Sequence, residues 1–594
     1  MPKNNAVKYF LGPLRALLRK MPEKNLLLLL SIIVGISCGL VAVILKVAIH
    51  LIQRSFMSLF SIMGSNYLIF ILPGIGMLLS LLIVRYIVKD NIGHGVTRVL
   101  VAISKNESRI DRHNIWSSIV TSALTIGFGG SVGAEAPIVY SGAAIGSNIG
   151  RHMGMSYRNI TILLGCGAAG AVAGIFNAPL AGVLFTLEIL LFNISMSSIL
   201  PLLLSTVSAT IVSYLCLGQE TQFACSLAAF KMGSVPFYLI LGVICGFCSL
   251  YFMRMTLSLE DRLSRIKNPY SLWIICAVAL GVLIFVFPPL FGEGYDFLGP
   301  LLNGGEVSYD KMTPLSFMLH KDWLIPIFFT LVLLLKVFAM TFTNAGGGVG
   351  GTFGPTLFVG AITGFVVASI TNLIVPGAIP VANFVLVGMA GLMAGVMQAP
   401  MTAIFLIAEL SGGYSLLLPL IITATVSYWI MRLFEKYSIY TKRIANRGEL
   451  LTHDSDQAVL TLLKVSSLIE NDFSTVRIDA PLKDLVEAFS SSTRNIFPVI
   501  DGKGRFQGYV SLGDLRKDMF DTSMYETKHV FNYVRSSPEY VYENEPMESV
   551  MRKFDKTGAW NLPVVTSERK YLGFVSKSKI FNAYREELKD FSQD

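Results

Sequence analysis

Charged side chains are scarce in this chain. Asp, Glu, Lys and Arg make up 15% of its 594 residues, whereas 53% are hydrophobic, and soluble domains usually carry about 25% charge. This shortage excludes an ordinary soluble protein and indicates a membrane protein. Several apolar runs are as long as the ~20 residues that a membrane-crossing helix requires. These runs are Leu26–Leu45, Tyr67–Val84, Phe237–Met253 and Leu272–Phe291.

Residues that usually build metal or redox sites are also few. The 7 histidines include no HExxH pair, and no Ser/His/Asp cluster suggests itself, which argues against an embedded zinc protease or another enzyme. All 7 cysteines precede residue 280, so the polar C-terminal part fits a reducing cytosol. Cys245 and Cys248 form a CxxC without acidic or His neighbours, and we interpret them as packing residues.

The net charge of +9 does not indicate nucleic-acid binding, because no basic recognition helix with interleaved aromatics is present. Basic residues such as Lys20 and Lys24 instead precede the first apolar run. That run is too long for a signal-peptide core and has no small-residue cleavage site after it. Since basic residues favour the cytoplasmic side, we predict a cytoplasmic N-terminus.

The composition changes near Tyr440, where the apolar, Gly-rich part ends and a charged tail begins. The tail contains an internal repeat. Asn495–Ile500 and Gly508–Ser511 in the first copy correspond to Asn561–Val565 and Gly573–Ser576 in the second. A strand, a turn, a second strand and a helix form a small α/β unit, and two such units normally pair. The repeat resembles a tandem pair of CBS domains.

The apolar part contains a second repeat. The segment Gly170–Glu188 matches Gly391–Glu409 without a gap in its Gly, Ala, Pro and Glu positions. Upstream, Gly129–Gly133 followed by Pro137 corresponds to Gly346–Gly350 followed by Pro355. With both termini on one side the total number of crossings is even, and if each half crosses an odd number of times, the second half is inverted. Such repeats place a substrate site at their interface, although glycines also serve close helix packing.

Helix N-termini are the expected binding groups at that interface. A helix N-terminus offers unpaired N–H groups and about half a positive charge, so several that converge attract an anion without a full cation. Candidate termini are Gly93–Gly95, Gly133–Pro137 and Gly351–Pro355. Glu135 lies in one of these turns, where its carboxylate would compete with an anion for the same amides and act as a gate. The alternative is a helix-capping glutamate without a role in transport.

These segments resemble the CLC family of chloride channels and chloride/proton antiporters. The family's gating motif Gly-Arg-Glu-Gly-Pro is matched by Gly133–Pro137, its Gly-x-Phe-x-Pro element by Gly351–Pro355, and its pore tyrosine by Tyr440. The resemblance implies that Glu135 is the gate. It also implies an anion site formed by His94, Gly95, Val96, Thr352, Phe353, Gly354 and Tyr440.

Three positions depart from the family pattern. His94 replaces a serine whose hydroxyl contacts the anion, and its imidazole either supplies an N–H donor or turns away and leaves the backbone amides to act. Ala134 replaces an arginine near the entry. Ile189 replaces an inner glutamate that carries protons in the antiporters, which favours passive conduction unless Glu188 or a water chain substitutes for it.

The resemblance implies a polytopic α-helical membrane protein with two inverted repeats, broken helices and a C-terminal α/β CBS pair. It also implies a multi-pass homodimer of the cell membrane, with both termini cytoplasmic, that moves chloride or a similar small anion. We expect a channel-like or weakly proton-coupled pathway, with a chloride/proton antiporter as the alternative. A non-conducting sensor would not explain the paired glycine-rich breaks. No cofactor is required.

The CBS pair carries one further expectation. Such pairs commonly bind adenine nucleotides, and a ribose-contacting aspartate is matched by Asp514, whereas Lys579 stands in the second copy. A purely structural or dimerising module is the alternative. The predicted segments are an amphipathic N-terminal segment at 1–25, a transmembrane domain at 26–440 with repeats at about 26–220 and 235–440, a linker at 441–463, and CBS domains at 464–527 and 528–590.

Overall fold

The computed structural model describes residues 21–63, 67–90, 92–190, 196–219, 223, 227–303, 313–446 and 463–592. The chain forms two compact units, Met1–Leu451 and Thr452–Asp594. Most of the predicted N-terminal segment and most of the predicted linker lie outside the described residues.

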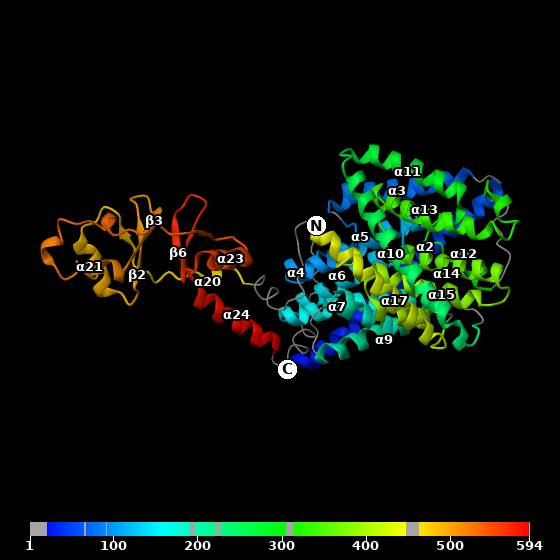
Figure 1. Ribbon diagram of the computed structural model, residues 1–594, viewed down its shortest axis with the longest axis horizontal. Coiled ribbons are helices and arrows are strands. Elements are labelled where there is room, and N and C mark those ends of the chain that lie inside the picture. The colour runs from blue at the N-terminus through cyan, green and yellow to red at the C-terminus, as the bar shows by residue number, and fades with distance from the viewer. Residues whose placement is uncertain are drawn as a thin grey trace, which may run out of the picture. The chain divides into compact units, whose positions relative to one another are not determined.

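The first unit is helical throughout its described part (Figure 1). Its α-helices are α2 (Glu23–Met63), α3 (Tyr67–Leu82), α4 (Gly95–Lys105), α5 (Asn114–Gly127), α6 (Glu135–Met153), α7 (Tyr157–Phe176), α8 (Pro179–Phe185), α9 (Met196–Leu217), α10 (Val235–Ser264), α11 (Pro269–Val286), α12 (Tyr295–Asn303), α13 (Ile325–Ala345), α14 (Phe353–Ile374), α15 (Val381–Met397), α16 (Pro400–Leu410), α17 (Leu417–Phe434) and α18 (Ile439–Asn446). π-Helical turns follow α3 and α8 at η1 (Ile83–Val88) and η2 (Thr186–Leu190), and short 3₁₀ turns lie at η3 (Met232–Ser234), η4 (Pro288–Leu290) and η5 (Ser316–Met318).

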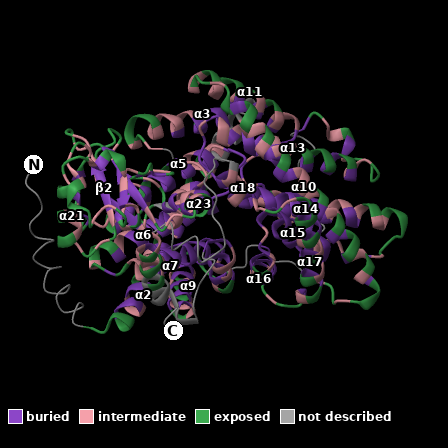
Figure 2. Cartoon of the chain, turned by 60° about the vertical axis from the view of Figure 1, so that its left-hand side comes forward, coloured by how far each residue is buried: buried purple, intermediate pink, exposed green. Residues whose placement is uncertain are grey.

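Nine helices in the described part of the chain are long and apolar enough to cross a membrane. They differ in depth within the bundle. In the most apolar 18-residue stretch of α7, 83% of the residues are buried inside the protein, whereas in that of α11 only 22% are. Figure 2 shows exposed and intermediate residues along α11. All exposed positions of α11 except Ser271 near its start are apolar, for example Ile274 and Val278, so this helix suits contact with lipid.

Proline ends the last of the predicted apolar runs early. The run was expected to extend from Leu272 to Phe291, but α11 stops at Val286. Pro288 and Pro289 lack an N–H group and open a 3₁₀ turn instead. The residues that follow this turn become important at the functional site.

Reciprocal hydrogen bonds relate the two halves of the first unit. The Ser131 N–H donates to Thr343 Oγ1 at 3.1 Å, and the Val349 N–H donates to Thr125 Oγ1 at 3.0 Å. Gly133 and Gly351 exchange backbone hydrogen bonds of 3.1 and 2.7 Å. Contacts in which each partner repeats the role of the other are those that a two-fold axis produces.

This pairing corrects the alignment of the upstream glycine runs by one residue. The sequence comparison set Gly133 against Gly350, whereas the structure pairs Gly133 with Gly351 in a β-bridge. The backbone conformations agree with the corrected register, because Gly129 (φ 93°) and Gly347 (φ 97°) then occupy equivalent positions and are both left-handed. Runs of neighbouring glycines contain no side chains that could fix the register in the sequence.

Other glycines in the repeats serve helix packing. A Cβ on Gly142 would lie 2.2 Å from the Gly167 carbonyl oxygen, and a Cβ on Gly360 would lie 2.5 Å from that of Gly388. These contacts bring α6 against α7 and α14 against α15. The packing interpretation therefore applies to these isolated glycines.

The second unit contains the predicted repeat as two similar three-stranded sheets, β1-β2-β3 and β4-β5-β6. In each sheet the first pair of strands is parallel and the second is antiparallel, with Val499 opposite Gly508 and Val564 opposite Gly573. The elements are α20 (Val465–Leu468), β1 (Val476–Arg477), α21 (Leu482–Ser491), β2 (Ile496–Ile500), β3 (Phe506–Ser511), α22 (Leu512–Leu515), η6 (Thr522–Met524), η7 (Val530–Asn532), β4 (Val541–Tyr542), α23 (Met547–Thr557), β5 (Asn561–Val565), β6 (Tyr571–Ser576) and α24 (Lys577–Ser592).

Candidate anion pathway

Glu135 is the first residue of α6 and is only 3% exposed. Its carboxylate is held by two donors from distant segments. The Tyr295 hydroxyl donates to Oε1 at 3.1 Å, and the Gly354 N–H donates to Oε2 at 3.2 Å. A charged group in a membrane interior costs ~2.5–3.5 kcal/mol or more unless it is compensated. The N-termini of α6 and α14 supply part of that compensation.

Three helix N-termini meet in the neighbourhood of Glu135. The Gly133–Gly351 bridge joins the turns that open α6 and α14. Helix α4 joins them because Gly95 has no side chain: a Cβ there would lie 2.3 Å from the Ala136 carbonyl oxygen. Val96 follows in the first turn of α4 and is buried. The structure therefore brings together the predicted site residues of α4, α6 and α14.

Two buried hydroxyls in this region, which lie near each other, make no hydrogen bond of normal geometry within the described part of the chain. Tyr440 is 2% exposed and Thr352 is 3% exposed, and Thr352 is the N-cap of α14. Buried polar groups normally find a partner, so these hydroxyls are suited to donate to a bound ion.

Comparison with known proteins places this arrangement in a family. Residues 75–432 match the family described as voltage gated chloride channel, which is more than half of the chain. The chain belongs to the voltage-gated chloride channel family. Residues 465–521 and 530–586 match the CBS domain. The prediction of a multi-pass, CLC-type membrane protein with a CBS pair is thereby confirmed.

Individual relatives agree with this assignment. A ClcB-like protein of Ralstonia nicotianae is 29% identical over 389 residues, which are 64% of this chain and 86% of that protein. The H(+)/Cl(−) exchange transporter ClcA of Vibrio cholerae is 26% identical over 439 residues, which are 70% of this chain and 88% of the transporter. The crystal structure of a slow cyanobacterial Cl−/H+ antiporter shares the fold, with a TM-score of 0.62 and 23% identity over 72% of this chain and 98% of that one.

His94, which replaces the family's serine, turns its imidazole towards an acidic side chain. It is the N-cap of α4 in a left-handed conformation (φ 56°), and its Nε2 lies 3.9 Å from Glu260 Oε1 on α10. Arg443 on α18 donates to both oxygens of Glu260, at 3.2 and 2.6 Å. This contact favours the second of the two interpretations, in which the backbone amides at Gly95 and Val96 face the ion.

Glu188 and Glu409 cap each other's helices. Glu188 accepts hydrogen bonds from the backbone N–H groups of Met401 and Thr402 at 3.0 and 2.7 Å, and from the Thr402 hydroxyl at 2.6 Å. Glu409 accepts from the N–H groups of Leu180 and Ala181 at 3.0 and 2.9 Å. Each carboxylate thus satisfies the orphan amides behind the proline that opens the other half's helix. Glu188 has a structural partner that sequence reasoning did not foresee.

Sequence reasoning also missed Glu293, Tyr295 and Lys336. The Ala134 N–H donates to Glu293 Oε1 at 2.9 Å, and the Lys336 ammonium donates to the Gly292 carbonyl at 2.9 Å. The sequence contained a hint of their role. Lys336 is a charged residue within an apolar run, and Glu293 stands between two glycines directly after another apolar run. Only the fold shows that both approach the turn before Glu135.

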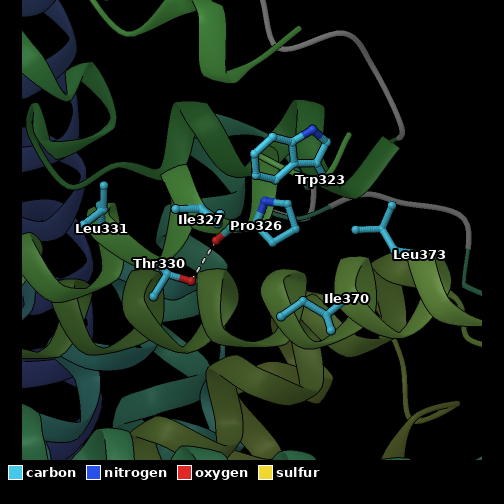
Figure 3. A pocket seen from close by; sticks show the side chains of 7 residues that line it. All are labelled: Trp323, Pro326, Ile327, Thr330, Leu331, Ile370 and Leu373. Carbon is cyan, nitrogen blue, oxygen red and sulfur yellow. Dashed lines mark hydrogen bonds between the residues drawn. The ribbon is translucent and has the colours of Figure 1, made fainter. Parts of the chain in front are cut away.

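A hollow of about 250 Å³ lies elsewhere in the first unit, between the start of α13 and the end of α14. Figure 3 shows Trp323, Ile327 and Ile370 around it. The only hydrogen bond drawn there lies within α13, from the Thr330 hydroxyl to the Pro326 carbonyl. This mostly apolar lining differs from the amides and hydroxyls around Glu135, and we do not include it in the candidate site.

In the tail, Asp514 is already engaged by the protein. It forms a capping box with Ser511, whose hydroxyl donates to Oδ2 at 2.8 Å, and it pairs with Arg535. A hollow of about 500 Å³ lies between the two copies, where Lys579 and Ser576 of the second copy line it together with Arg494 and Glu470 of the first. Arg494 pairs there with Glu470 at 2.8 Å and with Asp472 at 2.6 Å, so Lys579 is the cation that this hollow offers to a ligand.

Proposed function

We propose that this protein moves chloride or a similar small anion across a bilayer through a pathway gated by Glu135, in a channel-like or weakly proton-coupled manner. One observation carries the proposal. The Glu135 carboxylate occupies the Gly354 amide at the start of α14, next to buried hydroxyls of Thr352 and Tyr440 that have no partner among the described residues. A carboxylate that accepts the N–H groups of a helix start stands where an anion would bind.

The geometry supports a competition between the carboxylate and the anion. When ionised, Glu135 accepts from Tyr295 and Gly354 and blocks the amide that an anion requires. When it is protonated, it loses most of its attraction to the helix N-termini, so that chloride can replace it. Amides and hydroxyls bind the ion without a full cation, which permits rapid release. The proposal contains no catalytic step and requires no cofactor.

Uncoupled anion passage and chloride/proton antiport differ in whether the protein carries protons across the membrane. Ile189 is buried and cannot carry a proton, and Glu188 is held as the cap of α16. Both facts favour uncoupled passage. The alternative is a chloride/proton antiporter, which is supported by similarity to the exchange transporter ClcA.

Simultaneous recording of chloride and pH outside reconstituted liposomes distinguishes the two functions. We expect a chloride gradient to drive chloride efflux without a proportional uptake of protons. Proton movement against its own gradient, in a fixed ratio to chloride, would establish the antiporter instead. Absence of any chloride flux from correctly folded protein would refute both.

The assembly and the tail complete the proposal. We place the protein in the cell membrane as a homodimer with both termini in the cytoplasm, in line with its family. We further propose that the CBS pair binds an adenine nucleotide in the hollow between its two copies, with Lys579 supplying a cation for the phosphates. Calorimetry of the full-length protein with ATP, ADP and AMP tests this. Heat that is lost in Lys579→Ala supports the site, and no heat with any nucleotide leaves the pair a structural module.

A further inference from the structure

A short strap from Phe291 to Tyr295 packs against the turn that precedes Glu135. The Gly292 N–H donates to the Gly129 carbonyl at 3.0 Å. Gly292 and Gly294 both adopt left-handed backbone conformations, with φ of 59° and 91°, which side chains other than glycine rarely tolerate. These two glycines bend the strap so that Glu293, between them, faces the start of α6.

Glu293 binds the start of α6, the helix that Glu135 opens. Glu293 accepts the N–H of Ala134 at 2.9 Å, and Ala134 immediately precedes Glu135. Tyr295, two residues after Glu293, donates to Glu135 at 3.1 Å. The strap thus brings a second carboxylate to the gate and holds the gate itself through a hydroxyl.

The charged and titratable groups that face Glu293 come from several elements. Glu135 interacts with it electrostatically from α6, Lys46 from α2 and Lys336 from α13, while Tyr295 begins α12. Lys336 is fully buried and lies 4.8 Å above the Phe358 ring. Its partial removal from water and the nearby Glu135 carboxylate disfavour the ionised form of Glu293, whereas the Ala134 amide and the ammonium groups of Lys46 and Lys336 favour it. Glu135 has no cationic side chain among its hydrogen-bond donors in the described residues.

Access to solvent also differs between the two carboxylates. Glu293 is partly exposed, whereas Glu135 is buried. Like charges that share a site disfavour each other's ionisation. A negative charge on Glu293 therefore makes protonation of its buried neighbour easier.

We propose that Glu293 is a positioning residue of the gate, whose negative charge beside the start of α6 sets the pH at which Glu135 takes up its proton and opens the pathway. This inference rests on the proposed gating function. It assigns the strap Phe291–Tyr295 to pH sensing by the gate.

The test is chloride efflux from liposomes as a function of pH for the full-length protein and its Glu293→Gln variant. Glutamine can still accept the Ala134 N–H but removes the charge, so the midpoint of the pH dependence should move to lower pH by about one unit, a tenfold change in proton concentration. Glu293→Asp, which keeps the charge, should stay near the wild-type midpoint. If the glutamine variant fails to fold, Glu293→Ser should give the same downward shift.

A matched control and a double variant make the outcome decisive. Asp296→Asn removes an exposed carboxylate three residues further along and should leave the midpoint unchanged. In a Glu135→Gln background, Glu293→Gln should cause no further change. An unshifted midpoint in both neutral variants of Glu293 would overturn the inference alone, whereas an unchanged pH dependence in Glu135→Gln would overturn the gate itself.

Discussion

At the scale of single residues, the pathway depends on one position at which the two symmetric repeats carry different residues. The bridge between Gly133 and Gly351 places Glu135 opposite Phe353, and each opens its helix two residues after the bridge. Phe353 packs in an aromatic cluster, with ring centroids 5.4 Å from Phe176 and 6.3 Å from Phe185. Only the first repeat therefore carries a group that can compete with an anion and accept a proton.

The unpartnered hydroxyl of Tyr440 gives a prediction at this scale. Tyr440→Phe removes a buried donor that has no partner in the described protein, so no buried group is orphaned by the change and stability should be maintained. A hydrogen bond to a charged group contributes ~1.5–3 kcal/mol, so chloride affinity should fall by about tenfold or more. Calorimetric titration with chloride measures this, with Tyr437→Phe as the control. Unchanged affinity together with lower stability would assign the hydroxyl to the fold.

The strap supplies another residue-level prediction. Tyr295→Phe removes the hydroxyl that donates to Glu135 Oε1, which weakens the hold on the ionised gate. We expect chloride flux at neutral pH to rise by a few-fold, since a weaker hydrogen bond to the carboxylate favours its displacement. Liposome efflux at fixed pH provides the measurement. A decrease in flux would show that Tyr295 instead helps the ion to pass.

At the scale of elements, the two broken helices stabilise each other. Pro179 and Pro400 open α8 and α16, and the carboxylate that caps each helix comes from the other repeat. Such caps typically contribute about 1 kcal/mol each. The helices at this interface are therefore held in place by charge as well as by packing.

Replacing either capping glutamate by a neutral residue should lower the stability of the protein by a similar amount. Glu188→Gln and Glu409→Gln should each reduce the melting temperature in detergent, because glutamine loses the charge that interacts with the helix dipole. Asp261→Asn, at a side chain that is 69% exposed, should have little effect. Fluorescence-detected unfolding makes the comparison. If Glu188→Gln were as stable as wild type but changed proton movement, Glu188 would belong to a proton path.

The elements also show what the sequence can and cannot predict. Helix starts at Gly95, Glu135 and Phe353 were predictable because glycine and proline mark them chemically. The strap was not, since two prolines end α11 and direct the chain back to Gly129, a contact between positions far apart in the sequence. His94 could be recognised as an exception, but its approach to Glu260 depends on how α4 and α10 pack.

At the scale of the whole molecule, two repeats produce both the fold and the site. The two halves make reciprocal contacts at Thr125 and Thr343, at the glycine bridge and at the two capping glutamates. In each of these contacts, one half repeats the role of the other. The short helices that meet at the interface between the halves turn their N-termini inwards, where the backbone lines a site and does not face lipid. Duplication accounts for the scaffold, and the difference between Glu135 and Phe353 accounts for the proposed gate.

The most direct test of this account compares chloride efflux from liposomes containing wild-type protein or Glu135→Gln over the acid and neutral pH range. We expect wild-type efflux to rise as the pH falls, because protonation frees the Gly354 amide. The Glu135→Gln variant should conduct at every pH with almost no pH dependence. Efflux from the variant that follows the wild-type pH profile would contradict the central claim, because the proton would then act at another group.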